Sequence, residues 1–542
     1  MARAGALVSG APHSFAFADL WEAVSARVPS RTALVCGEHR RSFSELDDRA
    51  ARLAGWLAER GVGPGTYVGV QMCNRVEHVE AMLAGYKVRA IPVNINYRLG
   101  STELRYLYGD CGLVGVVHDE DLRADVAAAV RGLPNVRWTL AVGEAYDSAL
   151  TTAPLHPIAR SSDDLYALYT GGTTGSPKAV EWRMEDAFFA CLGGGDPTAE
   201  RSPVAAPAEL LERILAGRAF LPAAPLVHAA GMWTTLRWLL AGCKVVLLPR
   251  FAPGEIWEQI ARERVTNMSI VGDAMARPLL EALPAASASL NLTCLQTIVS
   301  GGSPLSPEVR ERLLAALPHL TIKDTYGASE TGSHGSALHS AAARASGAGR
   351  ATGFTAVDTV LLDPITHRHL PPGSDQPGLV ARRGRVPLRY HGDAVKSAAT
   401  FLIIAGQRYA LTGDLAVIRP DGTLQLLGRQ SQCINSGGEK IYPEEVEHAL
   451  RDHPDVGDAV VVGVADCRWG QRVIAVVAAR AGFSLSEEGL RSHCRGRLAG
   501  YKVPKRVLLV AAVQRTVAGK LDYRWAKQVA AEELARVEAG AG

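Results

Sequence analysis

The sequence predicts an α/β fold, with a large N-terminal part of stacked sheets and helices followed by a small α+β domain. Helical and strand-like hydrophobic patterns alternate along most of the chain, which is typical of α/β layers. The pattern changes past Gly428, and a boundary near Arg429 would leave about 110 residues, an ordinary size for a domain. At 542 residues the chain is also long enough for more than one domain.

The clearest N-terminal elements are a helix and the strand after it. Ser44 is expected to start the helix, with Asp47 three residues on, and Gly61 to stop it. The strand is YVGVQM, residues 67–72. The same order returns in 82–95 and 236–249, without the fixed period of a repeat protein.

Beyond Gly428, Pro443 suits the first turn of a helix with an acidic start. Strands are predicted near Val460 and Val473, a helix over Leu490–Leu498 and a strand over 506–510.

Composition excludes several classes of protein. Hydrophobic residues make up 47% and charged residues 21%, as in an ordinary globular protein rather than a disordered or fibrous one. Lys and Arg number 58 against 55 Asp and Glu, so the net charge of +3 gives no support for a nucleic acid partner. We expect no membrane span and no signal peptide, and the nine cysteines, without a CxxC pair, fit the reduced cytoplasm.

The most informative segment is LYTGGTTGSPKAV, Leu168 to Val180. Glycines let backbone N–H groups turn inward, hydroxyls add donors and Lys178 adds a charge, which together suit phosphate oxygens. The kinase-type loop GxxxxGK[ST] does not fit, because Ser176 and Pro177 precede Lys178 and Ala179 follows it. A plain surface loop is the alternative for this segment taken alone.

YTGGTTGSPK resembles the phosphate loop of the adenylate-forming superfamily, which includes acyl-CoA synthetases, peptide-synthetase adenylation domains and firefly luciferase. Four further segments resemble that family's motifs in the family's order: DTYGASETG from Asp324, YALTGDLAVI around Asp414, GRQSQCINSGGEKIYPEEVE from Gly428, and RTVAGKLDYRWAK containing Lys520. Five ordered matches make chance a poor explanation. The resemblance implies a core at 1–428, a hinge at 429–431 and a mobile lid at 432–542.

The resemblance also implies a role for each matched residue. Lys520 would bridge the attacking carboxylate and the α-phosphate, and Glu330 would ligate Mg²⁺. Tyr326 would stack on adenine near Asp324, and Ser329 would reach the α-phosphate. Thr170, Thr173, Thr174 and Lys178 would hold the β- and γ-phosphates, and Asp414 would accept the ribose hydroxyls with Arg429 assisting. The other nucleotide-binding residues that the matched motifs imply are Gly171, Gly172, Gly175, Ser176, Thr325 and Gly327.

Two segments resemble the family's acid pocket. His228, in PLVHAAGMW, would line and gate the pocket, although a lone His among apolar residues is more often structural. Gly301 and Gly302, in SGGSPLSP, would form its floor, and that segment also reads as a turn before a helix.

After adenylation, the family's lid rotates and replaces the lysine with the loop Ser436–Lys440, which here contains Gly437, Gly438 and Lys440. Lys502 and Lys505 are then candidate partners for CoA phosphates. Two positions depart from the family: Ser431 stands where a hinge Asp or Lys is usual, and Ala179 replaces a glycine.

Overall the chain resembles actinobacterial fatty-acid and steroid-side-chain CoA ligases. This implies ATP, Mg²⁺ and a small-molecule acid, with CoA as the acceptor since no carrier-protein motif follows Lys520. A same-fold ligase that adenylates nitrite to diazotise an aromatic amine is the alternative. A luciferase-like oxygenase and an ATP-binding sensor are further alternatives, and a homodimer is left open.

Overall fold

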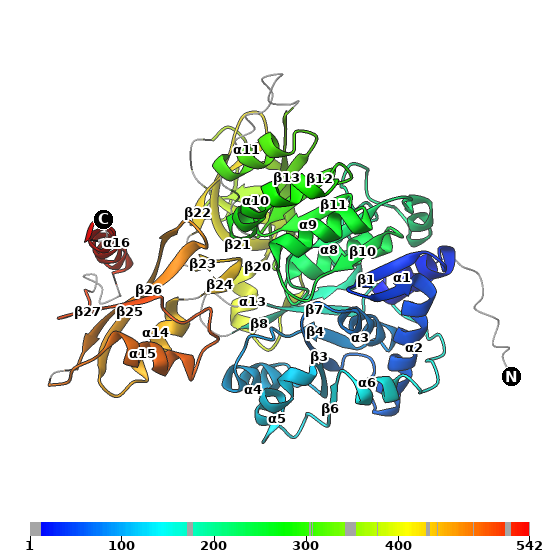
Figure 1. The fold of residues 1–542 in the computed structure, drawn as a ribbon, viewed down its shortest axis with the longest axis horizontal. Helices are drawn as coiled ribbons and strands as arrows, with labels where there is room; N and C mark the ends of the chain where they lie inside the picture. Colours follow the sequence, from blue (N-terminus) through cyan, green and yellow to red (C-terminus); the bar gives the residue numbers. More distant parts are fainter. Residues whose placement is uncertain are drawn as a thin grey trace.

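The computed structural model describes residues 12–170, 177–302, 305, 307–341, 354–374, 376, 378–429, 434–441, 443–480, 482–514 and 522–540. A large N-terminal part of sheets and helices is followed by a smaller C-terminal part, which lies to the left in Figure 1. The predicted fold class is therefore confirmed.

The largest sheet joins fifteen strands within the described residues. Its central strands are parallel, whereas pairing is antiparallel between β1 and β2 and everywhere beyond β13. The order is β17 (His369–Leu370), β16 (Thr359–Leu362), β18 (Gly378–Arg383), β21 (Gln407–Ile418), β22 (Thr423–Arg429), β15 (Phe354–Ala356), β14 (Gly332–Ser340), β13 (Thr321–Ala328), β12 (Thr297–Gly301), β11 (Asn267–Ile270), β9 (Ala219–Pro222), β10 (Lys244–Leu247), β1 (Thr32–Cys36) and β2 (His39–Ser42), with β20 (Phe401–Ile404) beside β21.

Two smaller sheets complete the N-terminal part. A parallel sheet has the order β4 (Ile91–Asn94), β3 (Tyr67–Gln71), β5 (Gly115–His118) and β6 (Trp138–Ala141). An antiparallel sheet has the order β19 (Arg389–Tyr390), β8 (Lys178–Arg183) and β7 (Leu165–Thr170). The predicted strand at 67–72 is confirmed as β3.

Helices pack against these sheets and bury their apolar faces, and Trp21, Trp182 and Trp257 are among the largest fully buried side chains. The α-helices of this part are α1 (Phe17–Arg27), α2 (Phe43–Glu59), α3 (Val76–Lys87), α4 (Ser101–Asp110), α5 (Arg123–Val130), α6 (Glu144–Ala149), α7 (Met184–Ala190), α8 (Ala229–Leu240), α9 (Pro253–Glu263), α10 (Gly272–Ser289), α11 (Pro307–Ala316) and α13 (Ala394–Thr400). The short 3₁₀ helices are η1 (Glu120–Leu122) and η2 (Pro207–Arg213).

Helix α2 corrects the predicted start at Ser44. Its N-cap is Ser42, whose hydroxyl accepts the Glu45 backbone N–H at 3.2 Å, while the Glu45 carboxylate accepts the Ser42 N–H at 2.7 Å. This reciprocal pair satisfies two backbone donors at once, and Ser44 lies inside the first turn. The helix ends at Glu59, before Gly61, as predicted.

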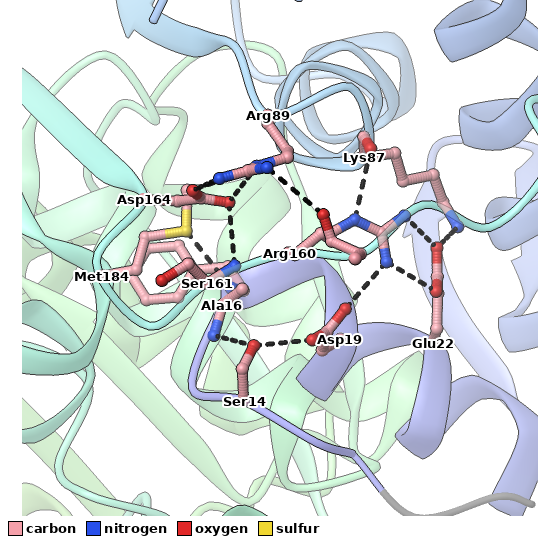
Figure 2. Close-up of polar contacts among 12 residues, drawn as sticks. Ser14, Ala16, Asp19, Glu22, Lys87, Arg89, Arg160, Ser161, Asp164 and Met184 are labelled. Carbon is pink, nitrogen blue, oxygen red and sulfur yellow. Dashed lines mark hydrogen bonds and ion pairs between the residues drawn. The ribbon is translucent and has the colours of Figure 1, made fainter. Parts of the chain in front are cut away.

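A partly buried ion network fixes the segment that leads into β7 (Figure 2). Arg160 donates to Asp19 at 2.8 Å and to both Glu22 oxygens at 2.9 Å, so it ties the segment to α1. Arg89 lies 2.7 Å from the carboxylate of Asp164, the residue directly before β7. These contacts anchor the strand that ends at Thr170.

The C-terminal part is a five-stranded sheet with helices on both faces. Residues of α14 and α15 pack with one apolar cluster of the sheet, and residues of α16 pack with the other. Its strands are β24 (Glu439–Ile441), β23 (Ile434–Ser436), β26 (Gly470–Ala479), β25 (Val456–Asp466) and β27 (Arg506–Val510), and its helices are α14 (Pro443–Arg451), α15 (Glu487–Arg495) and α16 (Tyr523–Gly540).

These elements confirm the helix predicted at Pro443 and the strands predicted near Val460, near Val473 and over 506–510. The helix predicted over Leu490–Leu498 begins and ends three residues earlier, at Glu487 and Arg495. Within the described ranges, no helix is both long enough and apolar enough to cross a bilayer.

Candidate functional site

The predicted phosphate site is built on the hairpin of β7 and β8. Thr170, the last residue of β7, pairs directly with Lys178, the first residue of β8. The connecting residues Gly171, Gly172, Thr173, Thr174, Gly175 and Ser176 lie outside the described residues. The register therefore brings the two ends of the predicted loop together.

Glu330 lies at the same corner, in the turn between β13 and β14. Its Oε1 accepts hydrogen bonds from the Thr170 hydroxyl at 3.3 Å and from the Tyr390 hydroxyl at 3.2 Å. The carbonyl of Ser329 accepts the indole N–H of the buried Trp182 at 3.2 Å, which holds the turn in place. The residue predicted to bind the metal thus lies beside a residue predicted to bind phosphate.

Lys178 has a partner that the sequence did not indicate. Its Nζ lies 3.0 Å from Oδ1 of Asp110, at the end of α4, and the Tyr169 hydroxyl donates to Oδ2 of Asp110 at 2.9 Å. Burial lowers the pKa of Lys178, but the hydrogen bond and charge of Asp110 outweigh burial, and the pKa is raised. Lys178 is therefore a charged group that a bound phosphate would share with Asp110.

The residues predicted to contact adenine and ribose lie on three strands of the large sheet, β13, β21 and β22. Asp324, Thr325, Tyr326 and Gly327 are in β13, and Asp414 is in β21. The Tyr326 hydroxyl donates to Oδ2 of Asp414 at 2.6 Å, which joins the two predicted subsites.

Neighbouring groups hold these two subsites. The Tyr326 ring stacks on that of His334, with centroids 4.9 Å apart. The backbone of Arg429, in β22, pairs with that of Asp414. Burial raises the pKa of Asp324 to about 6, against the opposing charge of Arg310.

The predicted floor of the acid pocket is packed against β13. Gly301 ends β12 and pairs with Thr325, and a Cβ at Gly301 would lie 2.4 Å from the Thr325 hydroxyl oxygen. That hydroxyl donates to the carbonyl of Ser300 at 2.8 Å. This close approach explains the glycine at 301, and Gly302 follows it directly.

The C-terminal part meets the core through the turn between β23 and β24, which holds Gly437 and Gly438. Oε1 of Glu439 lies 3.0 Å from Nε2 of His228 and 3.1 Å from Nη1 of Arg98. Burial lowers the pKa of His228 while the Glu439 carboxylate raises it, and the net shift is upward. Burial raises the pKa of Glu439 and His228 lowers it, with a net downward shift.

Gly438 fits this contact because it lacks a side chain. Its φ is +83°, and a Cβ would lie 2.6 Å from Cγ1 of Val271, just before α10. The turn at Gly437 and Gly438 therefore lies directly against the core, close to His228 at the start of α8.

Lys502 corrects the expectation that it contacts CoA phosphates. Its side chain is buried, and its Nζ lies 2.8 Å from Glu103 of α4 and 2.6 Å from Glu445 of α14. Lys502 therefore forms ion pairs with two carboxylates, and one of them, Glu103, belongs to the core. Lys505 is exposed.

The remaining predicted residues are placed only in part. Lys520 and the hinge position Ser431 lie outside the described residues, and Lys440 is described by its backbone, which pairs with Asn435 in β23. Sequence reasoning missed Asp110, Tyr390 and Glu439. Of these, only Glu439 carried a signal, since it lies within the segment Ser436–Lys440.

Family models match both parts of the chain. Residues 21–386 match the model described as AMP-binding enzyme, and residues 445–520 match the AMP-binding enzyme C-terminal domain.

Named relatives match over nearly the whole length. A medium/long-chain-fatty-acid-CoA/3-oxocholest-4-en-26-oate-CoA ligase of Mycobacterium marinum is 41% identical, covering 94% of this chain and 96% of the relative. A 3-oxocholest-4-en-26-oate-CoA ligase of Rhodococcus rhodochrous is 40% identical, covering 94% and 95%. Among solved structures, the amide bond synthetase McbA from Marinactinospora thermotolerans is similar with a TM-score of 0.80 and 25% identity, covering 95% of this chain and 99% of that one.

Proposed function

We propose that this chain, which belongs to the AMP-binding enzyme family, is an ATP- and Mg²⁺-dependent acid-CoA ligase that forms AMP. In the first step a carboxylate oxygen attacks the α-phosphorus of ATP. The new O–P bond replaces the bond to the β-phosphate, and pyrophosphate leaves with the electrons of the broken bond. In the second step the CoA sulfur attacks the acyl carbon, AMP leaves with the C–O bond electrons, and the thiol proton passes to solvent.

One observation supports the first step most directly: Glu330, Thr170 and Lys178 share one corner of the core. A lysine and backbone donors suit phosphate oxygens, and a carboxylate suits a hard divalent cation. In adenylation an anionic carboxylate attacks the anionic triphosphate of ATP, and anionic pyrophosphate leaves. Neutralising these charges and positioning the reactants therefore account for most of the catalysis.

The residues present fit Mg²⁺ bound together with a triphosphate. Mg²⁺ is commonly held by one or two carboxylates together with substrate phosphates, and Glu330 is a carboxylate at the phosphate corner. Glu330 would hold the ion, which would supply positive charge to neutralise the phosphate oxygens. Thr170 and Tyr390 orient the carboxylate through their hydrogen bonds.

The role of each other residue follows the same proposal. Tyr326 and Asp324 contact adenine, Asp414 and Arg429 bind the ribose, and Lys520 bridges the acid and the α-phosphate. The core spans 1–428, a hinge lies at 429–431, and the lid spans 432–542. We propose that thioester formation takes place in an arrangement like this one, in which Glu439 beside the Gly437–Gly438 turn contacts His228.

The proposed substrate is a largely apolar carboxylic acid, since the relatives named above act on fatty acids and on a steroid-side-chain acid. We infer that His228 lines the end of the acid pocket that takes the substrate carboxylate. Its contact with Glu439, at 3.0 Å, supports this inference because it places a polar pair between the core and the C-terminal part.

The test is pyrophosphate release by the full chain with ATP and Mg²⁺ over a panel of fatty, aryl and steroid acids and nitrite, with and without CoA. We expect release that depends on a fatty or steroid acid, and thioester and AMP only when CoA is added. Turnover of nitrite with an aminoarene and no need for CoA would overturn the proposal. An amine acceptor that replaces CoA at equal rate would overturn the assignment of CoA.

A further inference from the structure

Lys396 lies beside the phosphate corner, although no sequence motif included it. It is in the first turn of α13, where its backbone N–H donates to the capping Asp393 carboxylate at 2.9 Å. Its Nζ lies 4.3 Å from the centre of the Tyr390 ring. Because the hydroxyl of the same ring donates to Glu330 at 3.2 Å, Tyr390 connects Lys396 to the carboxylate proposed to hold Mg²⁺.

The backbone explains why these groups meet. In the three-stranded sheet, Tyr390 of β19 pairs with Val180 of β8, two residues after Lys178, and Lys178 pairs with Thr170. Helix α13 begins four residues after Tyr390. A short strand and the helix that follows it therefore bring a second lysine to the end of the sheet where the phosphate loop is attached.

The Lys396 ammonium group is only weakly compensated. The side chain is half-buried, and within the described part of the chain its contact is the Tyr390 ring, with no ion pair to a carboxylate. Burial lowers its pKa and the Lys178 charge lowers it further, while Glu330 and Asp393 raise it. Lys178 and Glu330 are thus near enough to act on Lys396, and a half-buried cation of this kind is stabilised by an anion.

We propose that Lys396 is a second cationic contact for the β- and γ-phosphoryl oxygens of ATP, and so for the pyrophosphate that leaves. This inference rests on the proposed function. Lys178 and Lys396, with Mg²⁺ at Glu330, would then surround the group that gains negative charge as its bond to the α-phosphorus breaks. AMP lacks both phosphoryl groups, so its binding does not use Lys396.

The test compares Lys396→Met and Lys396→Arg in the full chain with Mg²⁺, by measuring dissociation constants for ATP and AMP and the KM for pyrophosphate in the ATP exchange reaction. We expect Lys396→Met to weaken ATP and pyrophosphate about tenfold, the low end for a hydrogen bond to a charged group because the site is half exposed. AMP affinity should stay within about twofold, and Lys396→Arg should recover most of the ATP affinity.

Lys527→Met is the matched control, because Lys527 is exposed on α16 and should leave all three constants unchanged. Equal losses for ATP and AMP in Lys396→Met would show a structural role through Tyr390 and overturn the inference, as would unchanged ATP affinity. A wild-type chain that neither binds ATP nor exchanges pyrophosphate would instead overturn the proposed function.

Discussion

Glu103→Gln tests whether the contact between core and lid serves thioester formation. Glu103 belongs to α4 of the core, and its carboxylate lies 2.8 Å from Nζ of Lys502, which also binds Glu445 at 2.6 Å. The side chains of Lys502, Glu103 and Glu445 are 5%, 12% and 16% exposed, so these charges are largely removed from water. The substitution deletes the core's carboxylate charge from this contact.

The expected cost follows from this geometry. Removing one partner of a buried ion pair typically costs ~3–5 kcal/mol. Here Gln keeps an oxygen that accepts from Lys502, and Glu445 still compensates its charge. We therefore expect the docked lid to lose only ~1–2 kcal/mol, a factor of roughly 5–30 in its equilibrium with an undocked lid.

The assay separates the two half-reactions in single turnover. Thioester formation from preformed acyl-adenylate and CoA should slow about tenfold in Glu103→Gln, in proportion to the lost docking. Pyrophosphate release should keep its wild-type rate. Glu488→Gln is the control, because Glu488 pairs with Arg491 and Arg495 on the exposed side of α15 and should affect neither step. Equal slowing of both half-reactions, or of neither, would show that the contact between Glu103 and Lys502 does not serve thioester formation specifically.

Three further predictions concern the same site. Gly438→Ala should slow the thioester step by at least tenfold and leave adenylation unchanged, because the new Cβ would lie 2.6 Å from Cγ1 of Val271. An unchanged thioester rate in stopped-flow would show that this turn does not lie against the core during thioester formation. The contact between His228 and Glu439 raises the pKa of His228 and lowers that of Glu439. The ion pair therefore contributes fully to lid docking at a pH between the ordinary pKa values of Glu and His. Its contribution is lost as the pH rises through the raised pKa of His228 or falls through the lowered pKa of Glu439. The thioester rate of the wild type, divided by that of His228→Asn, should therefore fall above a pH of ~6.5, and a flat ratio from pH 6 to 9 would count against the pair. Because the Asp324 carboxyl has a pKa of about 6, the ATP dissociation constant should rise several-fold as the pH drops from 7 to 5, and calorimetry should find no such rise in Asp324→Asn.

Local patterns in the sequence predicted local structure well. The strands β3 and β25–β27 are encoded by short apolar runs. The start of α2 shows the limit of this reasoning. Ser42 and Ser44 are both reasonable caps, and the choice depends on which acidic side chain reaches back to the backbone, which is Glu45.

Contacts between distant residues could not be predicted in this way. Tyr390 meets Glu330 across 60 positions, Lys178 meets Asp110 across 68, and Lys502 meets Glu103 across 399. No local periodicity marks such pairs, because they depend on how strands and helices pack. The expectation for Lys502 was wrong for this reason: as a residue near a chain turn it resembles a solvated lysine, and only the fold reveals its two carboxylates.

Single-turnover analysis of Lys520→Ala with ATP, Mg²⁺ and a fatty acid tests whether this lysine drives adenylate formation. A unit charge at ~4 Å with an effective dielectric of about 20 is worth ~4 kcal/mol, or roughly three decades in rate when it acts in the transition state. We predict that pyrophosphate release slows about a thousandfold, while ATP still binds and preformed acyl-adenylate still reacts with CoA at the wild-type rate. Near-normal pyrophosphate release by this variant would contradict adenylation guided by Lys520.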